Sequence, residues 1–274
     1  MEIGTLGPLV VRIDGTSIVP SAAKPRQLLA LLAVSPGREV TMSAITEELW
    51  DAEPPSGPVG VVQTYVKQLR RSITTALGPA HGTDAKALLR RGYYGYALDL
   101  PGAPCEARRF EDLTARGLRA LGEGGPEGDE EASRLLTRAL ATWRGDALAG
   151  IRAGRPLRAE ALRLEETRSA ALEGRITADL RLGRHASVVG ELAALAERFP
   201  LQENLHAQLM LALYRCGRPF HALETFRRLR RSCVEELGIE PSAPLQRLHR
   251  AVLCGDPSLE APAREGGTLH LAAF

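Results

Sequence analysis

Short apolar runs and amphipathic segments alternate over the first hundred residues. The runs 6–13 and 17–19 flank Asp14-Gly15, a dipeptide typical of a tight hairpin turn, and predict two antiparallel strands. Residues 88–100, rich in tyrosine and punctuated by glycine, predict a second hairpin. Between the hairpins, the spacing of apolar residues predicts three helices, at 25–34, 41–50 and 59–77.

The third of these helices has one apolar stripe and one polar face. At 100° per residue, four apolar side chains share a narrow sector and are predicted to enter the core: Val62, Val66, Leu69 and Ile73. The opposite face carries Gly60, Thr64, Lys67, Gln68 and Arg71, with Gln63 and Arg70 on one shoulder and Tyr65 on the other. Such a face is either simply solvated or a binding surface.

From residue 106 to residue 254 the pattern is helical, with breaks at 122–126, 145–156 and 199–200. Leu180–His185 returns as Tyr214–Pro219 at an offset of 34 residues. Thirty-four residues is the period of the tetratricopeptide repeat, in which glycine turns one helix back onto the next. We therefore predict a mainly α protein. A winged helix-turn-helix (α+β) over 1–101 precedes an all-α tetratricopeptide-like domain over 105–254, and 255–274 is predicted to be a mobile tail.

Composition restricts the class of protein. No apolar run approaches the roughly 18 residues of a membrane span, and the first residues do not resemble a signal peptide, so a cytoplasmic location without membrane contact is expected. The four cysteines are widely spaced, and the six histidines form no metal or catalytic motif. We expect no enzyme activity and no cofactor.

Charge is distributed unevenly in the N-terminal half although the net charge is only +2. Residues 57–98 carry six basic side chains against Asp84 alone, whereas residues 39–53 carry five acidic side chains and no basic one. A local basic stretch beside a predicted helix-turn-helix favours nucleic-acid binding.

Several motifs resemble the Streptomyces antibiotic regulatory proteins, a family of activators of secondary-metabolite gene clusters. The resemblance covers about residues 3–254 and rests on the order of motifs along the chain. The N-terminal ones are Leu6-Gly7-Pro8-Leu9, the segment 24–32, Glu48-Leu49-Trp50, Gln63-Thr64-Tyr65-Val66, Leu69-Arg70-Arg71 and Gly95-Tyr96-Ala97-Leu98. The C-terminal ones, similar to a bacterial transcriptional activator domain, are Trp143-Arg144-Gly145, the segments 180–185 and 209–214, and Glu236-Leu237-Gly238-Ile239-Glu240-Pro241.

The resemblance implies an OmpR/PhoB-type winged helix that binds direct repeats in promoter DNA as two copies and recruits RNA polymerase. The chain departs from the family at Val59-Gly60, where members tend to carry Arg-Asn, and in the wing, where its basic residue is displaced. Because a one-residue slip moves a strand side chain to the other face, either Arg90 or Arg91 is left as the wing arginine that reaches DNA.

The expected DNA-binding residues have distinct tasks. Thr64 and Gln68, one turn apart on the outward face, suit base edges in the major groove, since glutamine pairs with adenine and the threonine methyl packs on thymine. Phosphate contacts, which position without specifying sequence, are expected from Lys24, Arg26, Lys67, Arg70 and Arg71. The wing is expected to contribute Arg90, Arg91 and Tyr94, and Tyr65 completes the expected set.

An acidic surface is expected to serve a different partner. In winged helices of the resembling type, the loop between the second and third helices contacts RNA polymerase holoenzyme or its sigma subunit. Prolines stiffen this loop here. The expected polymerase-contacting residues are Glu47, Glu48, Asp51 and Glu53. The alternative function is an interaction scaffold without affinity for DNA, in which the tetratricopeptide-like half is the working part.

Overall fold

The computed structural model describes residues 1–78 and 84–260, and its internal contacts divide the chain into two compact units. The first unit joins Met1–Leu118 to Leu135–Leu172, and the second joins Arg119–Arg134 to the chain from Glu173 onward. A winged helix followed by helices is confirmed as the fold class. The boundary at residues 101–105 stays a prediction, since the compact units are divided elsewhere.

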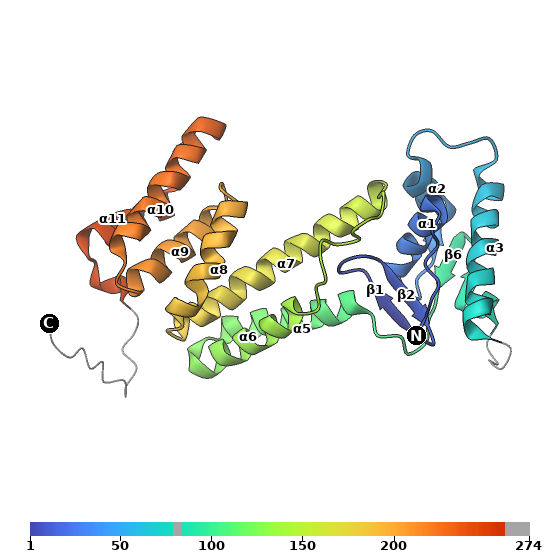
Figure 1. The fold of residues 1–274 in the computed structure, drawn as a ribbon, viewed down its shortest axis with the longest axis horizontal. Helices are drawn as coiled ribbons and strands as arrows, with labels where there is room; N and C mark the ends of the chain where they lie inside the picture. Colours follow the sequence, from blue (N-terminus) through green and yellow to red (C-terminus); the bar gives the residue numbers. More distant parts are fainter. Residues whose placement is uncertain (79–83, 261–274) are drawn as a thin grey trace. The chain divides into compact units, whose positions relative to one another are not determined.

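The winged helix consists of two small sheets and a cluster of helices (Figure 1). One antiparallel sheet has the order β1-β2-β3, and the other has the order β4-β6-β5. The strands are β1 (Glu2–Gly4), β2 (Val10–Ile13), β3 (Thr16–Ser17), β4 (Val40–Thr41), β5 (Leu89–Arg91) and β6 (Gly95–Leu98). The helices are α1 (Ala23–Ala33), α2 (Met42–Trp50), α3 (Pro58–Leu77) and the short α4 (Ala85–Leu88).

Local chemistry explains most of these elements. Asp14 and Gly15 both adopt positive φ, 47° and 80°, as the tight turn between β2 and β3 requires. The Thr41 hydroxyl caps α2 by accepting a hydrogen bond from the Ala44 backbone at 3.2 Å. The first predicted strand, however, begins too early: residues 6–9 form a loop, and β1 was not predicted because three residues carry too little pattern.

That loop packs on a segment far away in the sequence. The Arg144 backbone N–H donates to the Leu6 carbonyl at 2.7 Å, and its guanidinium donates to the Pro8 carbonyl and to Glu106. Gly7, at φ 149°, has no room for a side chain, because a Cβ there would lie 2.9 Å from the Arg144 Cβ. Leu148 and Leu157 enter the same core as α1 and α3. The winged helix thus shares its core with residues beyond the predicted boundary.

The remaining elements are helices, and most of the connections between them are short, except the segment 141–154 between α6 and α7. They are α5 (Glu106–Glu123), α6 (Gly125–Leu140), α7 (Arg155–Arg181), α8 (His185–Arg198), α9 (Glu203–Arg215), α10 (Pro219–Ser232) and α11 (Ala243–Cys254). A π-helical turn at Cys233–Leu237 follows α10, and a 3-10 turn at Pro257–Leu259 follows α11. The helices α5, α6 and α7 contribute residues to both compact units.

The 34-residue repeat is visible in the second unit. The helices α7 and α9 end at Arg181 and Arg215, and α8 and α10 begin at His185 and Pro219. The glycines between them, Gly183 and Gly217, adopt positive φ of 75° and 71°, which lets the chain reverse direction at each of these turns. The equivalent core positions are also buried in both copies: Val188 with Ala222, and Leu192 with Phe226.

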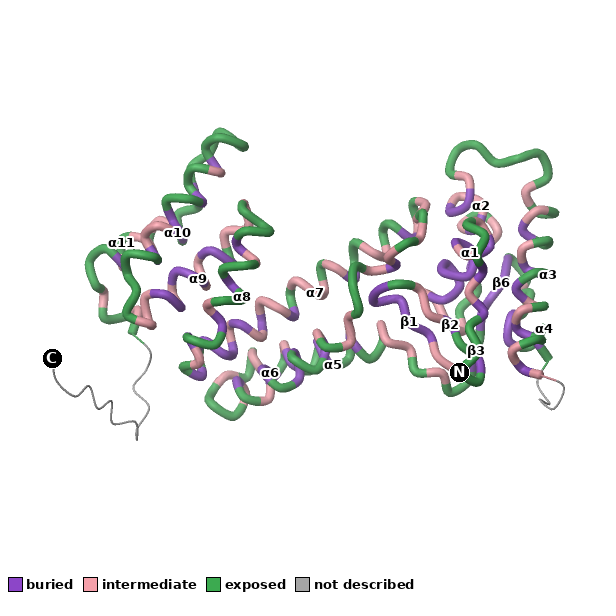
Figure 2. The backbone as a smooth tube through the Cα atoms, in the orientation of Figure 1, coloured by how far each residue is buried: buried purple, intermediate pink, exposed green. Residues whose placement is uncertain are grey.

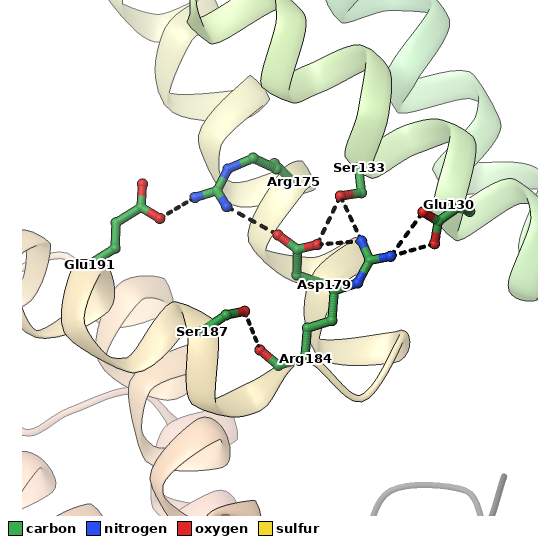
Figure 3. A network of polar contacts seen from close by, with 7 residues as sticks. All are labelled: Glu130, Ser133, Arg175, Asp179, Arg184, Ser187 and Glu191. Atoms are coloured by element: carbon green, nitrogen blue, oxygen red, sulfur yellow. Dashed lines mark hydrogen bonds and ion pairs between the residues drawn. The ribbon is translucent and has the colours of Figure 1, made fainter.

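A polar network ties α6, α7 and α8 together within this unit (Figure 3). The buried carboxylate of Asp179 accepts hydrogen bonds from Ser133 at 2.8 Å, from Arg175 at 3.0 Å and from Arg184 at 3.2 Å. Both arginines continue to a second acid, Arg175 to Glu191 and Arg184 to Glu130. Because the buried Asp179 carboxylate is paired with two guanidinium groups, the network positions the helices without an uncompensated buried charge.

The predicted tail 255–274 is described only to residue 260. Up to that point it is attached, since the Arg215 guanidinium donates to the Leu259 carbonyl at 2.8 Å; residues 261–274 lie outside the described residues. Within the described ranges, no helix has the length and apolar character that crossing a membrane requires.

Candidate nucleic-acid interface

The helix α3 presents the two faces that its sequence predicts. Val62, Val66, Leu69 and Ile73 are all at most 2% exposed and pack in the core of the first unit. Figure 2 shows the same helix alternating between a buried and an exposed side. The α-helical period alone produces this separation, because each apolar residue lies three or four positions from the next.

The exposed side of α3 is polar and has no acidic residue. Gly60, Thr64, Lys67, Gln68 and Arg71 are all exposed. The side chains of Lys67, Gln68 and Arg71 form no hydrogen bond or ion pair with any residue that the structure describes. The Thr64 hydroxyl donates to the Gly60 carbonyl of its own helix at 3.0 Å. This surface carries charge and amide groups that are free for an external partner.

The wing is the β5–β6 hairpin, and Glu39 holds its turn. The Glu39 carboxylate accepts hydrogen bonds from the backbone N–H groups of Tyr94 and Gly95, the second at 2.6 Å. The Tyr94 carbonyl accepts from Met42 N–H at 2.9 Å, so the wing is joined to the start of α2. Sequence analysis counted Glu39 only as part of an acidic stretch, and no local signal marks its capping role.

Two glycines make this close approach possible. A Cβ on Gly95 would lie 1.9 Å from the Val40 carbonyl oxygen, and one on Gly92 would lie 2.2 Å from the Glu39 carboxylate. Gly95 therefore excludes a side chain, because the obstructing atom belongs to the backbone, whereas a side chain at position 92 would displace the Glu39 carboxylate from the turn.

The two wing arginines differ in what they bind. Register places Arg90 opposite Ala97 and Arg91 opposite Tyr96. Arg90 donates to the Gly37 carbonyl at 3.0 Å, whereas Arg91 is exposed and has no hydrogen bond or ion pair within residues 1–78 and 84–260. At the tip, Tyr93 and Tyr94 are 90% and 68% exposed and stack edge to face. Sequence analysis selected Tyr94 but missed Tyr93, whose position between two turn glycines was the available signal.

Two family models match successive parts of the chain. Residues 16–94 match the family model described as transcriptional regulatory protein, C terminal, and residues 105–253 match the bacterial transcriptional activator domain. The regulatory protein DnrI of Streptomyces peucetius is 47% identical over the whole of this chain and 98% of its own length. The chain belongs to the Streptomyces antibiotic regulatory protein family.

Two further relatives extend the comparison. The transcriptional regulator RedD of Streptomyces coelicolor is 34% identical, with 96% of this chain and 73% of that protein covered. The solved structure of Mycobacterium tuberculosis EmbR superposes with a TM-score of 0.80 at 32% identity. It covers 96% of this chain, which in turn spans 66% of the EmbR chain. Like these relatives, the chain described here is a transcriptional regulator, and its family supports a DNA-binding role.

The structure changes the roles of three basic residues expected to bind phosphate. The Arg70 Nε and Nη2 atoms both donate to the Leu89 carbonyl, at 3.0 and 2.7 Å, so Arg70 ties α3 to the first wing strand. Lys24 donates to the Leu49 carbonyl at the end of α2, and Arg26 donates to the Pro20 and Ser21 carbonyls before α1. Each of these side chains already donates to a backbone carbonyl, which uses part of its hydrogen-bonding capacity, and a phosphate contact from any of the three stays a prediction.

Lys24 also loses part of its solvation. Burial lowers the pKa of its ammonium group, and the nearby Arg152 lowers it further, while the Glu48 carboxylate opposes both. Tyr65 is similarly half-buried, because it packs against the core of the first unit. Neither residue belongs to the open surface of α3.

The expectation that Glu48 contacts polymerase is wrong, because its side chain is buried. Glu48 is 1% exposed, and its carboxylate accepts hydrogen bonds from Gln27 at 2.7 Å, Gly154 N–H at 2.6 Å and Leu157 N–H at 2.9 Å. The last two are backbone donors at the start of α7. Glu48 therefore caps α7 and joins it to α2.

The other acidic residues remain near the surface. Glu47 is half-buried and pairs with Arg155 at 3.4 Å, a contact open to solvent. Asp51 and Glu53 are exposed in the loop 51–57 between α2 and α3, and neither side chain has a hydrogen bond or ion pair with a described residue. The acidic surface is thus reduced to three residues.

Proposed function

We propose that this regulator activates a secondary-metabolite (antibiotic) gene cluster by binding direct repeats in its promoter and recruiting RNA polymerase. The observation that carries the proposal is the exposed face of α3. It has basic and amide side chains and no acid on the helix beside them, and the wing next to it carries Arg91; none of these basic and amide side chains has a partner among the residues that the structure describes.

In this proposal, Thr64 and Gln68 contact base edges, because they lie one turn apart on the outward face of a helix that fits the major groove. Lys67 and Arg71 bind the flanking phosphates. Arg91 is the wing arginine that enters the minor groove, since Arg90 is bonded to Gly37. Tyr94 lies beside it at the exposed tip of the hairpin.

Direct repeats imply two copies bound side by side on DNA. The two copies face the same side of the duplex if the repeats lie about one helical turn, roughly 10–11 base pairs, apart. Footprinting on promoters of the surrounding gene cluster tests the site directly. Inserting about half a turn between the repeats should abolish cooperative binding while each half-site keeps its affinity. Cooperativity that survives the insertion would contradict the side-by-side arrangement.

The polymerase contact is proposed to involve Glu47, Asp51 and Glu53 of the loop after α2. Asp51 supports this assignment, since it adopts φ 54° and ψ −118°, a conformation that favours glycine. A non-glycine residue held there costs about 1–3 kcal/mol. An exposed aspartate in a strained position, without an internal partner among the described residues, is consistent with selection for its side chain rather than for folding.

Two substitutions at Asp51 separate function from folding. Asp51→Gly should increase the free energy of unfolding, by about 0.5–1 kcal/mol, because glycine relieves the strain. We expect it to retain promoter binding but to lose most transcription from a purified polymerase holoenzyme. Asp51→Asn, which keeps the shape and removes the charge, should lose transcription without gaining stability. Full transcription by Asp51→Gly would exclude a polymerase contact through this side chain.

A further inference from the structure

A small pocket lies in the second unit, lined by residues of α8, α9 and α10 and by Pro200 in the connection between α8 and α9 (Figure 1 shows the helices). Its volume is about 230 Å³. Ala196 and Leu229 supply apolar lining. The polar groups of the lining are those of His206, Thr225, Arg228, Arg231 and Ser232 and one acid, Glu197, which pairs with Arg228. The pocket is distinct from the DNA-binding surface, which belongs to the first unit.

His206 is the unusual group in this pocket. Its side chain lines the cavity and is only 5% exposed. The Phe199 and Pro200 carbonyls lie close enough to act on the ring, but neither ring nitrogen forms a hydrogen bond of normal geometry with the described residues. Thr225, also buried in the lining, donates its hydroxyl to the His221 carbonyl at 2.9 Å and is satisfied. Leaving a buried polar group unpaired costs about 1–3 kcal/mol, so an external partner for the imidazole would recover that free energy.

The imidazole is neutral near pH 7. Burial lowers the pKa of His206, and the positive charge of Arg228 lowers it further. The carbonyls of Phe199 and Pro200 and the Glu203 carboxylate act in the opposite direction. A neutral ring presents one donor and one acceptor, so it can bind a polar ligand atom without bringing a second buried charge.

Two arginines provide positive charge at the same place. Arg228 and Arg231 are three residues apart on α10 and are both exposed. Arg228 is 3.7 Å from Glu197, in a pair whose side chains are 56% and 82% exposed, so the contact is weak and easily exchanged. Arg231 has no hydrogen bond or ion pair with the residues that the structure describes.

We propose that this pocket binds a carboxylate ligand, from either a small organic acid or an acidic side chain of a peptide. Arg228 and Arg231 bind the carboxylate, and His206 hydrogen-bonds a polar atom deeper in the pocket. The carbon chain of the ligand packs on Ala196 and Leu229. A volume of about 230 Å³ is below that of typical sites for drug-sized ligands, so only a short ligand fits.

The test uses the full chain and the ring proton signals of His206, assigned by their loss in His206→Asn. The probes are glutarate, its uncharged analogue glutaramide, inorganic phosphate, and the peptide acetyl-Asp-Glu-amide. We expect glutarate or the peptide to move the His206 signals and to raise the ring pKa, because the bound negative charge favours the imidazolium. Glutaramide should have no effect.

Variants on α10 distinguish this site from nonspecific anion binding. The double variant Arg228→Gln/Arg231→Gln should weaken the responding probe by at least about tenfold, the loss expected for charge-assisted hydrogen bonds. The matched control is Arg227→Gln, on the same helix and paired with Glu224 outside the pocket, which should bind normally. Circular dichroism melting checks that each variant is folded.

The outcomes separate the sources of the carboxylate. A response to glutarate alone identifies a small acid, and a response to the peptide alone identifies a protein segment. The proposal is overturned if no carboxylate moves the His206 signals at concentrations up to about 20 mM, well above a millimolar Kd. It is also overturned if phosphate binds in place of the carboxylates, or if the double variant binds as tightly as the unmodified chain. Promoter binding by the same variants is measured separately, so that failure of the pocket proposal can be distinguished from failure of the proposed DNA-binding function.

Discussion

The outer face of α3 and the start of α1 both carry basic side chains. Those on α3 form no internal hydrogen bond or ion pair with the described residues, whereas those on α1 do. Lys67 and Arg71 on α3 have no partner among the described residues. Lys24 and Arg26 on α1 donate to backbone carbonyls within the winged helix. Positive charge in the sequence is therefore not equivalent to positive charge available for DNA, since unsatisfied carbonyls at turns and helix ends compete for it.

Adjacent acids on α2 differ in the same way. Glu47 is partly exposed and bound only to Arg155 in solvent, whereas Glu48 is buried and accepts three hydrogen bonds from distant segments. One position along a helix rotates a side chain by 100°, which is enough to move it from the surface to the core. Four experiments test whether charged groups with internal partners differ in function and stability from those without.

The largest effect is expected at Glu48. Glu48→Ala should lower the free energy of unfolding by about 3 kcal/mol or more, because the buried donors of Gln27, Gly154 and Leu157 lose their acceptor. Urea denaturation measures this loss. Glu47→Ala is the matched control and should change stability by less than about 0.5 kcal/mol. Equal effects of the two substitutions would contradict the capping role of Glu48.

The next effect concerns sequence preference. Gln68→Ala should reduce discrimination between the matched and a scrambled site by about 1–3 kcal/mol, the range for a good base contact. Gel-shift titrations against both sites measure the ratio. Thr75→Ala, near the end of the same helix, is the control, since its hydroxyl is bonded to its own backbone at Arg71. An unchanged ratio in Gln68→Ala would remove its base-reading role.

Arg70 and Arg71 should respond differently although they are neighbours. Arg71→Ala should weaken binding to matched and scrambled DNA alike, by about tenfold, and reduce the salt slope by about one. Arg70→Ala should instead lower stability by about 1–2 kcal/mol, because two bonds to the Leu89 carbonyl are lost. Affinity at two salt concentrations and urea denaturation give both quantities. A stable Arg70→Ala with a reduced salt slope would restore Arg70 as a phosphate contact.

The smallest effect is expected at the start of α1. Lys24→Gln and Arg26→Gln should each change affinity for promoter DNA by less than about threefold, since a residue bound to backbone carbonyls adds little to phosphate binding. The salt dependence of binding should also stay unchanged. If either variant lowers the salt slope as Arg71→Ala does, the contrast between α1 and α3 fails.

Features that depend on near neighbours along the chain could be predicted from the amino-acid sequence. Val62 and Ile73 are buried, and Gly183 and Gly217 reverse the chain 34 residues apart, because helical period and glycine conformation are local properties. The outward position of Gln68 follows from the same period. Strand β1 was too short to leave such a pattern.

Which charged side chains have internal hydrogen-bond partners is known only from the tertiary structure. Glu48 finds its backbone donors 106 and 109 residues away, and Arg70 finds the Leu89 carbonyl 19 residues away. The local sequence does not predict these contacts, because a hydrogen bond depends on the positions of the two segments in the folded protein. The period of a helix predicts the direction of a side chain, but the groups that the side chain contacts depend on how the whole chain folds.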